Sequence, residues 1–176
     1  MYEVDSLDKV VKLRDAPRPD TGAPLPMILC DEHHLLISNF VSEPDPKWDG
    51  SYTTMVSPES DGMAIACVRF KWPSAHMFGP PNDEAFSGHP LAARGLQPYA
   101  VFEVHDSSWI RKLERMNSVH RSHNRERFLE GRRHFVFAFH DSTFECVADG
   151  FEVEMLRGSM RTTVTHMAGL LSERPG

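Results

Sequence analysis

The chain has 176 residues, of which 40% are hydrophobic and 25% charged, and this size and balance predict a single globular domain. Its apolar stretches are far shorter than the roughly 20 residues that a membrane-spanning helix needs, so we expect no contact with a membrane. The formal net charge of −6 argues against general nucleic-acid binding, so no nucleic-acid partner is expected.

The N-terminus lacks the basic and apolar regions of a secretory signal, so we expect a cytoplasmic protein whose cysteines are free thiols. Leu7, Val10 and Val11 recur at helical spacing behind a capping Ser6, and a Pro-rich stretch follows them. We therefore predict an N-terminal helical arm with a Pro-rich linker over residues 1–26. Residues 27–176 are then one domain.

The next part of the chain has the patterns of β-strands. Strands are predicted at 27–31, 34–41, 52–56, 63–72 and 99–105, the first two as a hairpin. Residues 73–98 are rich in Gly and Pro and predict a long functional loop.

Helices are predicted after the last of these strands. Residues 106–108 can cap a helix, and a second helical patch covers 124–130. The apolar stripe of the first helix is expected to comprise Trp109, Leu113, Met116 and His120.

The clearest pattern is the alternation of three phenylalanines in residues 134–140. Two tight turns then predict a three-stranded meander through 143–148 and 151–156. The expected register pairs Cys146 with Phe137 and with Val153 on one apolar face. The fold class that follows is α+β, with an antiparallel, strongly bent or barrel-like sheet, a few packed helices and an enclosed ligand pocket.

Cys146 is the thiol with the best-defined predicted surroundings, a Phe-lined sheet interior. A buried free Cys often serves only as a small hydrophobe. If the interior is instead a ligand cavity, the thiol acts as a nucleophile or sulfur donor. Cys67 is the second candidate, because Arg69 on the same strand face would favour a thiolate.

Polar residues of the loop and the hairpin form a second set of candidates. The candidate proton carriers are Glu145, His140, Asp83, Glu84 and His89, and the candidate substrate-binding residues are Arg69, Asn82, Ser87, Asp141 and Thr143. Glu145 and His140 can pair diagonally across the hairpin. Strand alternation puts Glu145 and Cys146 on opposite faces, so they do not form one site. Turn chemistry and an exposed polar face are the alternative interpretation.

Cofactor signatures are missing from the sequence: it has neither a dinucleotide-binding glycine motif nor a P-loop. We therefore expect no cofactor. Cys30, Asp31, His33 and His34 are clustered, but no second Cys or His pair completes a zinc site, so no metal is predicted.

Charge is unevenly distributed along the chain. Residues 31–61 contain seven acidic residues and one Lys, whereas residues 111–133 contain eight basic and three acidic residues. The basic segment is either an anion-binding surface or a solvated helical surface.

Three segments carry a resemblance to known proteins. They are residues 78–91, with the run Phe-Gly-Pro-Pro-Asn-Asp-Glu, residues 103–113, with Ser-Ser-Trp-Ile, and residues 134–148, with Phe-His-Asp-Ser-Thr-Phe-Glu-Cys. Together they resemble a widespread bacterial family of small uncharacterised proteins. The resemblance covers less than half of the chain and implies no activity, but it does imply that the loop and the meander belong together.

The leading functional hypothesis is a cofactor-independent enzyme that modifies a small polar, sugar- or nucleoside-like metabolite through Cys146. The alternatives are a noncatalytic partner-binding or immunity-type protein that uses the acidic segment, and a metal-dependent enzyme built from scattered histidines. A deep pocket converging on Cys146 would favour the first hypothesis. A filled interior with a flat acidic face would favour binding.

Overall fold

The computed structural model describes the chain except for residues 1, 44–48, 50, 52–54 and 173–176. The strands in chain order are β1 (Lys9–Lys12), β2 (Met27–Cys30), β3 (Leu35–Phe40), β4 (Met63–Lys71), β5 (Ala75–Gly79), β6 (Ala100–His105), β7 (Arg133–Ala138), β8 (Thr143–Ala148) and β9 (Gly150–Gly158). The α-helices are α1 (Ser108–Asn117), α2 (Arg125–Leu129) and α3 (Met160–Leu170), and short 3₁₀ turns lie at Phe86–Gly88 and Ala92–Arg94.

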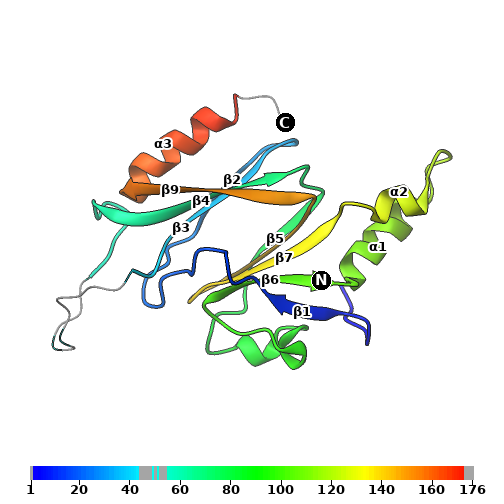
Figure 1. Cartoon of the computed structure of the whole chain (residues 1–176), viewed down its shortest axis with the longest axis horizontal. Coiled ribbons are helices and arrows are strands. Elements are labelled where there is room, and N and C mark those ends of the chain that lie inside the picture. Colours follow the sequence, from blue (N-terminus) through cyan, green and yellow to red (C-terminus); the bar gives the residue numbers. More distant parts are fainter. Residues whose placement is uncertain (1, 44–48, 50, 52–54, 173–176) are drawn as a thin grey trace.

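Two antiparallel sheets form the centre of the protein (Figure 1). One has the strand order β1-β6-β7-β8-β5 and the other β2-β3-β4-β9. Apolar side chains from both sheets, such as Phe70 of β4 and Phe137 of β7, form one buried cluster between them. The predicted α+β class with antiparallel strands is confirmed. The described strands form two stacked sheets rather than the expected barrel-like one.

Both outer faces of this sandwich are covered. Met160 and Met167 of α3 pack on the four-stranded sheet. The five-stranded sheet is covered by Trp109 of α1 and by residues 80–99, which we call the 80–99 loop. Helix α1 begins as predicted, because the Ser107 hydroxyl caps the backbone N–H of Ile110.

The predicted apolar stripe of α1 is only partly correct. Trp109 is buried and Leu113 packs against the same cluster, but Met116 is 63% exposed and His120 is also exposed.

Among the described residues, no helix combines the length and apolar character needed to cross a bilayer.

The N-terminal segment differs from its prediction. Residues 9–12 form strand β1, not a helix, and pair with β6. Val10 and Val11 are β-branched, and β6 presents an edge to which an extended segment can add. Tyr2 at the start of the segment is buried against the five-stranded sheet.

The predicted loop at 73–98 is also partly wrong, because it contains the edge strand β5. The predicted strands at 27–31, 34–41, 63–72 and 99–105 are present. The one predicted at 52–56 falls on residues 52–54, which lie outside the described residues.

The predicted meander is correct only in its first hairpin. The turn lies at His140–Asp141, one residue earlier than expected, and the Phe139 N–H donates to the Ser142 carbonyl at 2.9 Å. Each partner therefore shifts by two residues, and Cys146 pairs with Phe135. A shift of two preserves the face of every side chain, so Cys146 still points to the interior.

The third strand predicted for the meander belongs to the four-stranded sheet. β9 pairs with β4 in the other sheet instead of with β8. The predicted pair of Cys146 and Val153 is therefore wrong, although Val153 packs against the same interior cluster from the opposite sheet.

Replacing the interior thiol by a hydroxyl tests this packing. We expect Cys146→Ser to lower the free energy of unfolding by about 1 to 3 kcal/mol, because the hydroxyl enters a Phe-lined core with no partner provided for it. The measurement is urea unfolding at pH 7. In the matched control, Cys30→Ser at the exposed thiol should change stability by less than about 0.5 kcal/mol. Equal stability of the two variants would contradict a packed interior.

Candidate functional site

The thiol favoured by the sequence lies in a filled interior. Cys146 is 0% exposed and packs in the cluster that contains Phe135 and Phe144. Burial, followed by the neighbouring Glu145 charge, raises the pKa of this thiol well above its ordinary value. These surroundings correct the expectation of a cavity thiol, because they oppose the thiolate that a nucleophile requires.

The reserve candidate, Cys67, is also buried. It packs with Leu36 and Met167 beneath α3, and burial raises its pKa to about 11. Arg69 follows two residues later on the same face of β4, opposite Glu152 of β9. This face belongs to the other sheet, so Cys67 and Arg69 are not part of a site with the hairpin.

Cys30 is the exposed thiol of the three. Its Sγ lies 4.0 Å from His76 Nε2, and the His76 ring stacks on Phe144. This pair joins the edge strands β2 and β5 of the two sheets. Of the three thiols, Cys30 is therefore the one that solvent and an imidazole both reach.

A buried polar network lies on the opposite face of β8 from Cys146. Glu145 Oε2 accepts hydrogen bonds from Tyr2 Oη at 2.6 Å and from His134 Nε2 at 2.9 Å. Its Oε1 lies 3.2 Å from His89 Nε2. The structure thus brings together the predicted residues His89 and Glu145, but it encloses them. Glu145 does not pair with His140 as predicted.

The hydrogen-bond pattern fixes the protons of both imidazoles. The backbone N–H of Leu91 donates to His89 Nδ1 at 3.1 Å, so the His89 proton is on Nε2 and points to Glu145. His134 Nε2 lies 2.9 Å from Glu145 Oε2, a carboxylate oxygen that can only accept, so His134 also donates from Nε2. Its Nδ1 lies 2.9 Å from the hydroxyl oxygen of Ser107, which also accepts the N–H of Ile110.

Glu145 is consequently an ionised carboxylate with three donors. Burial by itself raises its pKa, but the hydrogen bonds from His134, His89 and Tyr2 outweigh burial and lower the pKa to about 2. Burial, with the adjacent Glu145 charge, raises the pKa of Tyr2, so its hydroxyl keeps the proton that it donates. Glu145 thus joins the N-terminal segment, the 80–99 loop and β7 through hydrogen bonds.

A second polar cluster, which we call the His140 cluster, lies where the 80–99 loop meets the β7–β8 turn. It consists of His140, Asp83, Tyr99 and Asp141. His140 Nδ1 lies 2.9 Å from Asp141 Oδ1, and its Nε2 lies 3.9 Å from Asp83 Oδ2. The Tyr99 hydroxyl donates to Asp83 Oδ2. The His140 side chain is 38% exposed, so this cluster is open to solvent.

The local backbone positions these groups. The Asp83 N–H donates to the carbonyl of His140 at 2.8 Å, which fastens the loop to the turn. Tyr99 has a φ of 59°, a left-handed conformation that is unfavourable for an aromatic residue. Its hydrogen bond to Asp83 helps to offset that strain. Asp83 Oδ1 is buried and has no hydrogen-bond partner among the described residues.

The cluster perturbs the pKa values of its members. The hydrogen bond to Asp141 is the main cause that raises the pKa of His140, and the charges of Asp83 and Glu84 add to it. The hydrogen bond from Tyr99 lowers the pKa of Asp83, and the same bond raises the pKa of Tyr99 to about 12. His140 is therefore an imidazole with a raised pKa that lies between two carboxylates.

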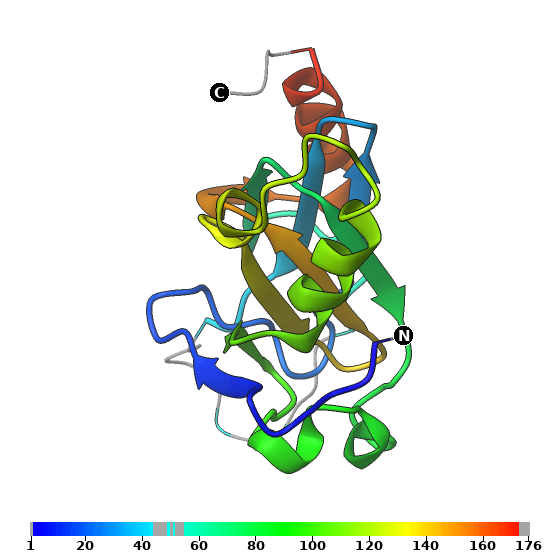
Figure 2. The ribbon, with the colours of Figure 1, turned by 90° about the vertical axis from the view of Figure 1, so that its right-hand side faces the viewer.

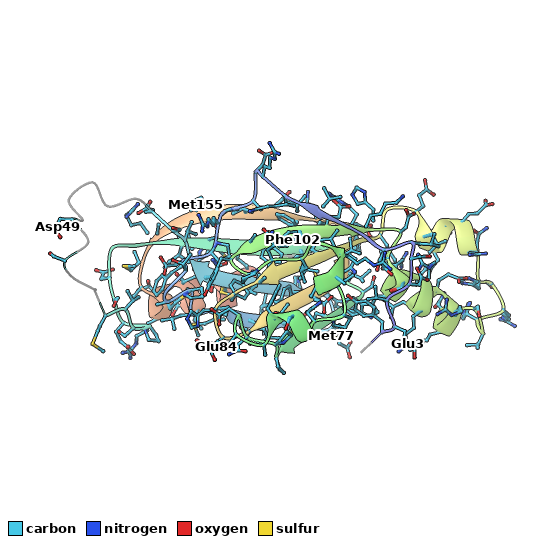
Figure 3. All side chains as sticks on the ribbon, turned by 90° about the horizontal axis from the view of Figure 1, so that it is seen from below. Glu3, Asp49, Met77, Glu84, Phe102 and Met155 are labelled. Atoms are coloured by element: carbon cyan, nitrogen blue, oxygen red, sulfur yellow. The ribbon has the colours of Figure 1, made fainter. Side chains whose placement is uncertain are left out.

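The remaining predicted residues of this region have mainly structural contacts. Asn82 Oδ1 accepts the N–H of Ala85 at 3.1 Å, as the turn interpretation expected. The Thr143 hydroxyl is buried and donates to the carbonyl of Pro81 at 3.0 Å. Glu84 and Ser87 are exposed on the 80–99 loop. Figure 3 labels Glu84 at the outer surface.

Four residues of these two networks were missing from the prediction: Tyr2, Tyr99, Ser107 as a partner of histidine, and His134. His134 is the second residue of β7, and strand alternation puts its side chain on the same face as those of Val136 and Ala138, so the sequence pattern could have placed it on the Glu145 face. No local sequence pattern could predict the hydrogen bond of Tyr2, because its partner Glu145 lies 143 residues away in the chain.

Histidine is used throughout as the partner of a carboxylate. Seven of the ten histidines lie within 4.0 Å of one, including the pairs His123–Glu114 at 2.8 Å and His166–Glu154 at 2.7 Å. Within the described part of the chain, no group of three or more His, Cys, Asp or Glu side chains is arranged to hold a metal ion.

Comparison of the chain with protein-family models, curated proteins and solved structures finds no match. The resemblance to a family of small bacterial proteins stays a prediction.

Alkylation distinguishes the three thiols. We expect iodoacetamide to modify the native protein once, at Cys30, because Cys67 and Cys146 are buried with raised pKa values. Three adducts should form after unfolding in urea. Intact-mass spectrometry with peptide mapping provides the count and the positions. An adduct on native Cys146 at a rate comparable to that of Cys30 would mean that the interior is accessible.

The Glu145 network predicts a pH dependence of stability. The folded pKa of about 2 lies below the ordinary 4.5, so the carboxylate stabilises the fold above pH 4.5 and this contribution is lost as the pH falls toward 2. Its size is about 3 kcal/mol. Glu145→Gln should remove this acid-dependent part and destabilise the protein at pH 7 by about 2 to 3 kcal/mol, because the amide NH₂ faces hydrogen-bond donors.

Urea unfolding between pH 7 and pH 3 tests this prediction, with the exposed Glu59→Gln as the control. The wild-type and control proteins should lose stability in parallel on acidification. A Glu145→Gln protein that follows the same pH profile would assign the acid sensitivity to other groups.

Proposed function

We propose that the protein is a cofactor-independent enzyme that acts on a small hydroxylated metabolite by general acid–base catalysis, with His140 as the proton carrier. The observation that carries this proposal is the position of the His140 imidazole between two carboxylates at a solvent-open loop junction. Titratable groups with perturbed pKa values cluster in this way at catalytic sites.

The roles within the cluster follow from its hydrogen bonds. Asp141 keeps a proton on the imidazole, and His140 donates this proton to a substrate oxygen. Asp83 is oriented by Tyr99, and its buried Oδ1 accepts a hydrogen bond from a substrate hydroxyl. The class of metabolite is the one expected from the sequence. The reacting group, however, is the imidazole of His140 and not the thiol of Cys146.

Noncatalytic partner binding is the second candidate, and the filled interior around Cys146 favours it. The acidic segment supports it less. Asp31 and Glu32 precede β3 and Glu43 follows it, so a buried six-residue strand separates these charges. Asp45 and Lys47 of this segment lie outside the described residues.

Measurements of turnover and of binding distinguish the enzyme from the noncatalytic binding protein. A set of monosaccharides and nucleosides is incubated with the protein and followed by proton NMR of the small molecules. We expect conversion of one of them, and we expect His140→Asn to lower kcat/KM by about 100- to 10,000-fold. His166→Asn is the matched control, because His166 has the same 38% exposure and also pairs with a carboxylate. Binding without conversion would favour the second candidate.

The pH dependence tests the role of Asp141. Because the pKa of His140 is raised, the imidazolium persists to higher pH, and the rate should fall as pH rises through that pKa. Asp141→Asn removes the main cause of the raised pKa and should move this fall to lower pH. Titration of the His140 ring signals by NMR provides an independent measure. An unchanged His140 pKa in Asp141→Asn would exclude Asp141 from this role.

A further inference from the structure

A hollow of about 620 Å³ lies between α1 and residues 3–5, and we call it the α1 groove. It lies at the end of the molecule that carries α1 and α2, which faces the viewer in Figure 2. Glu3 lines this groove, and Glu84 follows Asp83 of the His140 cluster in the sequence; Figure 3 labels both residues, which lie well apart along the long axis of the molecule. The α1 groove is therefore separate from the site proposed above.

The floor of the groove contains a hydroxyl with no assigned role. Ser108 lines the hollow and is only 5% exposed, yet its Oγ has no hydrogen-bond partner among the described residues. Its backbone N–H donates to Asp8 Oδ1 at 2.7 Å, and the neighbouring Ser107 caps the helix. Native proteins rarely leave such a group unpaired, so the hydroxyl indicates a polar atom supplied by a ligand.

The wall formed by α1 is basic. Arg111, Lys112 and Arg115 all line the groove, one to two turns along the helix from Ser108. Arg111 is neutralised by Asp5, with Nη2 to Oδ2 at 2.5 Å. The exposed guanidinium of Arg115, in contrast, has no ion pair with any described residue. A guanidinium presents paired donors that match the oxygens of phosphate and carboxylate groups.

The lining contributed by residues 3–5 is different in character, because it includes the carboxylate of Glu3. This carboxylate repels a bare anion but accepts hydrogen bonds from hydroxyl groups. The positive end of helix α1 is already occupied by the Asp8 carboxylate, which accepts the Ser108 N–H, so the positive charge offered to a ligand comes from the basic side chains. The groove thus offers an oxyanion position at Arg115 and a hydroxyl acceptor at Glu3.

We propose that the α1 groove binds a small hydroxylated oxyanion, such as a sugar phosphate or a sugar acid. Arg115 binds the oxyanion, Lys112 adds positive charge, and the Ser108 hydroxyl donates to the ligand. Glu3 accepts from the ligand hydroxyls. This binding is independent of the chemistry proposed for His140.

The test is a titration of the full-length ¹⁵N-labelled protein at constant ionic strength with glucose 6-phosphate, gluconate and glucose. We expect amide shifts confined to residues 3–5 and 108–116 with one or both anions and not with glucose, and the comparison of the anions separates phosphate from carboxylate. Arg115→Gln should weaken binding by about tenfold or more, since it removes a charge-assisted contact. Ser108→Ala should weaken it by several fold, and His140→Asn should leave it unchanged.

The matched control is Arg121→Gln, which removes an equally exposed positive charge outside the groove and should leave binding unchanged. An absence of shifts with both anions would overturn the proposal. So would equal weakening by Arg115→Gln and Arg121→Gln, which would indicate attraction to the basic surface as a whole, or retained affinity in both Arg115→Gln and Ser108→Ala proteins.

Discussion

Glu145 is an ionised carboxylate buried between the five-stranded sheet and the segments that cover it, where donors from distant parts of the chain meet. Tyr2 comes from the N-terminus, His89 from the 80–99 loop and His134 from β7. Ser107 extends the network to the start of α1. A buried charge is costly unless it is fully hydrogen-bonded, so these segments are constrained to dock together.

The position of the exposed chemistry depends on this constraint. His89 anchors the 80–99 loop at its middle, and the same loop carries Asp83 to the β7–β8 turn. His140 and Asp83 therefore meet at the surface, whereas the carboxylate of Glu145 is enclosed. The N-terminal segment is anchored by Tyr2 and by the stack of its ring on Trp109 at 5.4 Å, and this docking forms one wall of the α1 groove.

The two faces of β8 separate apolar packing from polar chemistry. Cys146 points between the sheets, where aromatic rings fill the space, and Glu145 points to the covering layer. A thiol in that interior contributes to packing, because burial disfavours its thiolate. The chemical interest of the hairpin consequently lies in its turn, at His140 and Asp141, rather than in its strands.

Local patterns were sufficient to predict most strands, the N-terminal cap of α1 and the face to which each side chain of β7 and β8 points. The alternation of Phe135, Phe137 and Phe139 defines one buried face whichever turn is used, because side chains alternate with a period of two. The exact register was missed by two residues, since either of two adjacent polar dipeptides could form the turn. Asp83, His140 and Asp141 were predicted as candidates because they lie in the Gly- and Pro-rich loop and in the hairpin, and the structure brings them together.

The sequence by itself therefore determined the α+β class, the antiparallel strands and the opposite facing of Glu145 and Cys146. Only the tertiary structure decided that β1 is a strand, that β9 joins the other sheet and that the interior is filled. These outcomes depend on which edge or face is available for pairing and packing, and such long-range choices leave no local pattern. The partners of Glu145 were decided in the same way, because Tyr2 and His89 are distant in sequence and become its donors only when their segments cover the sheet.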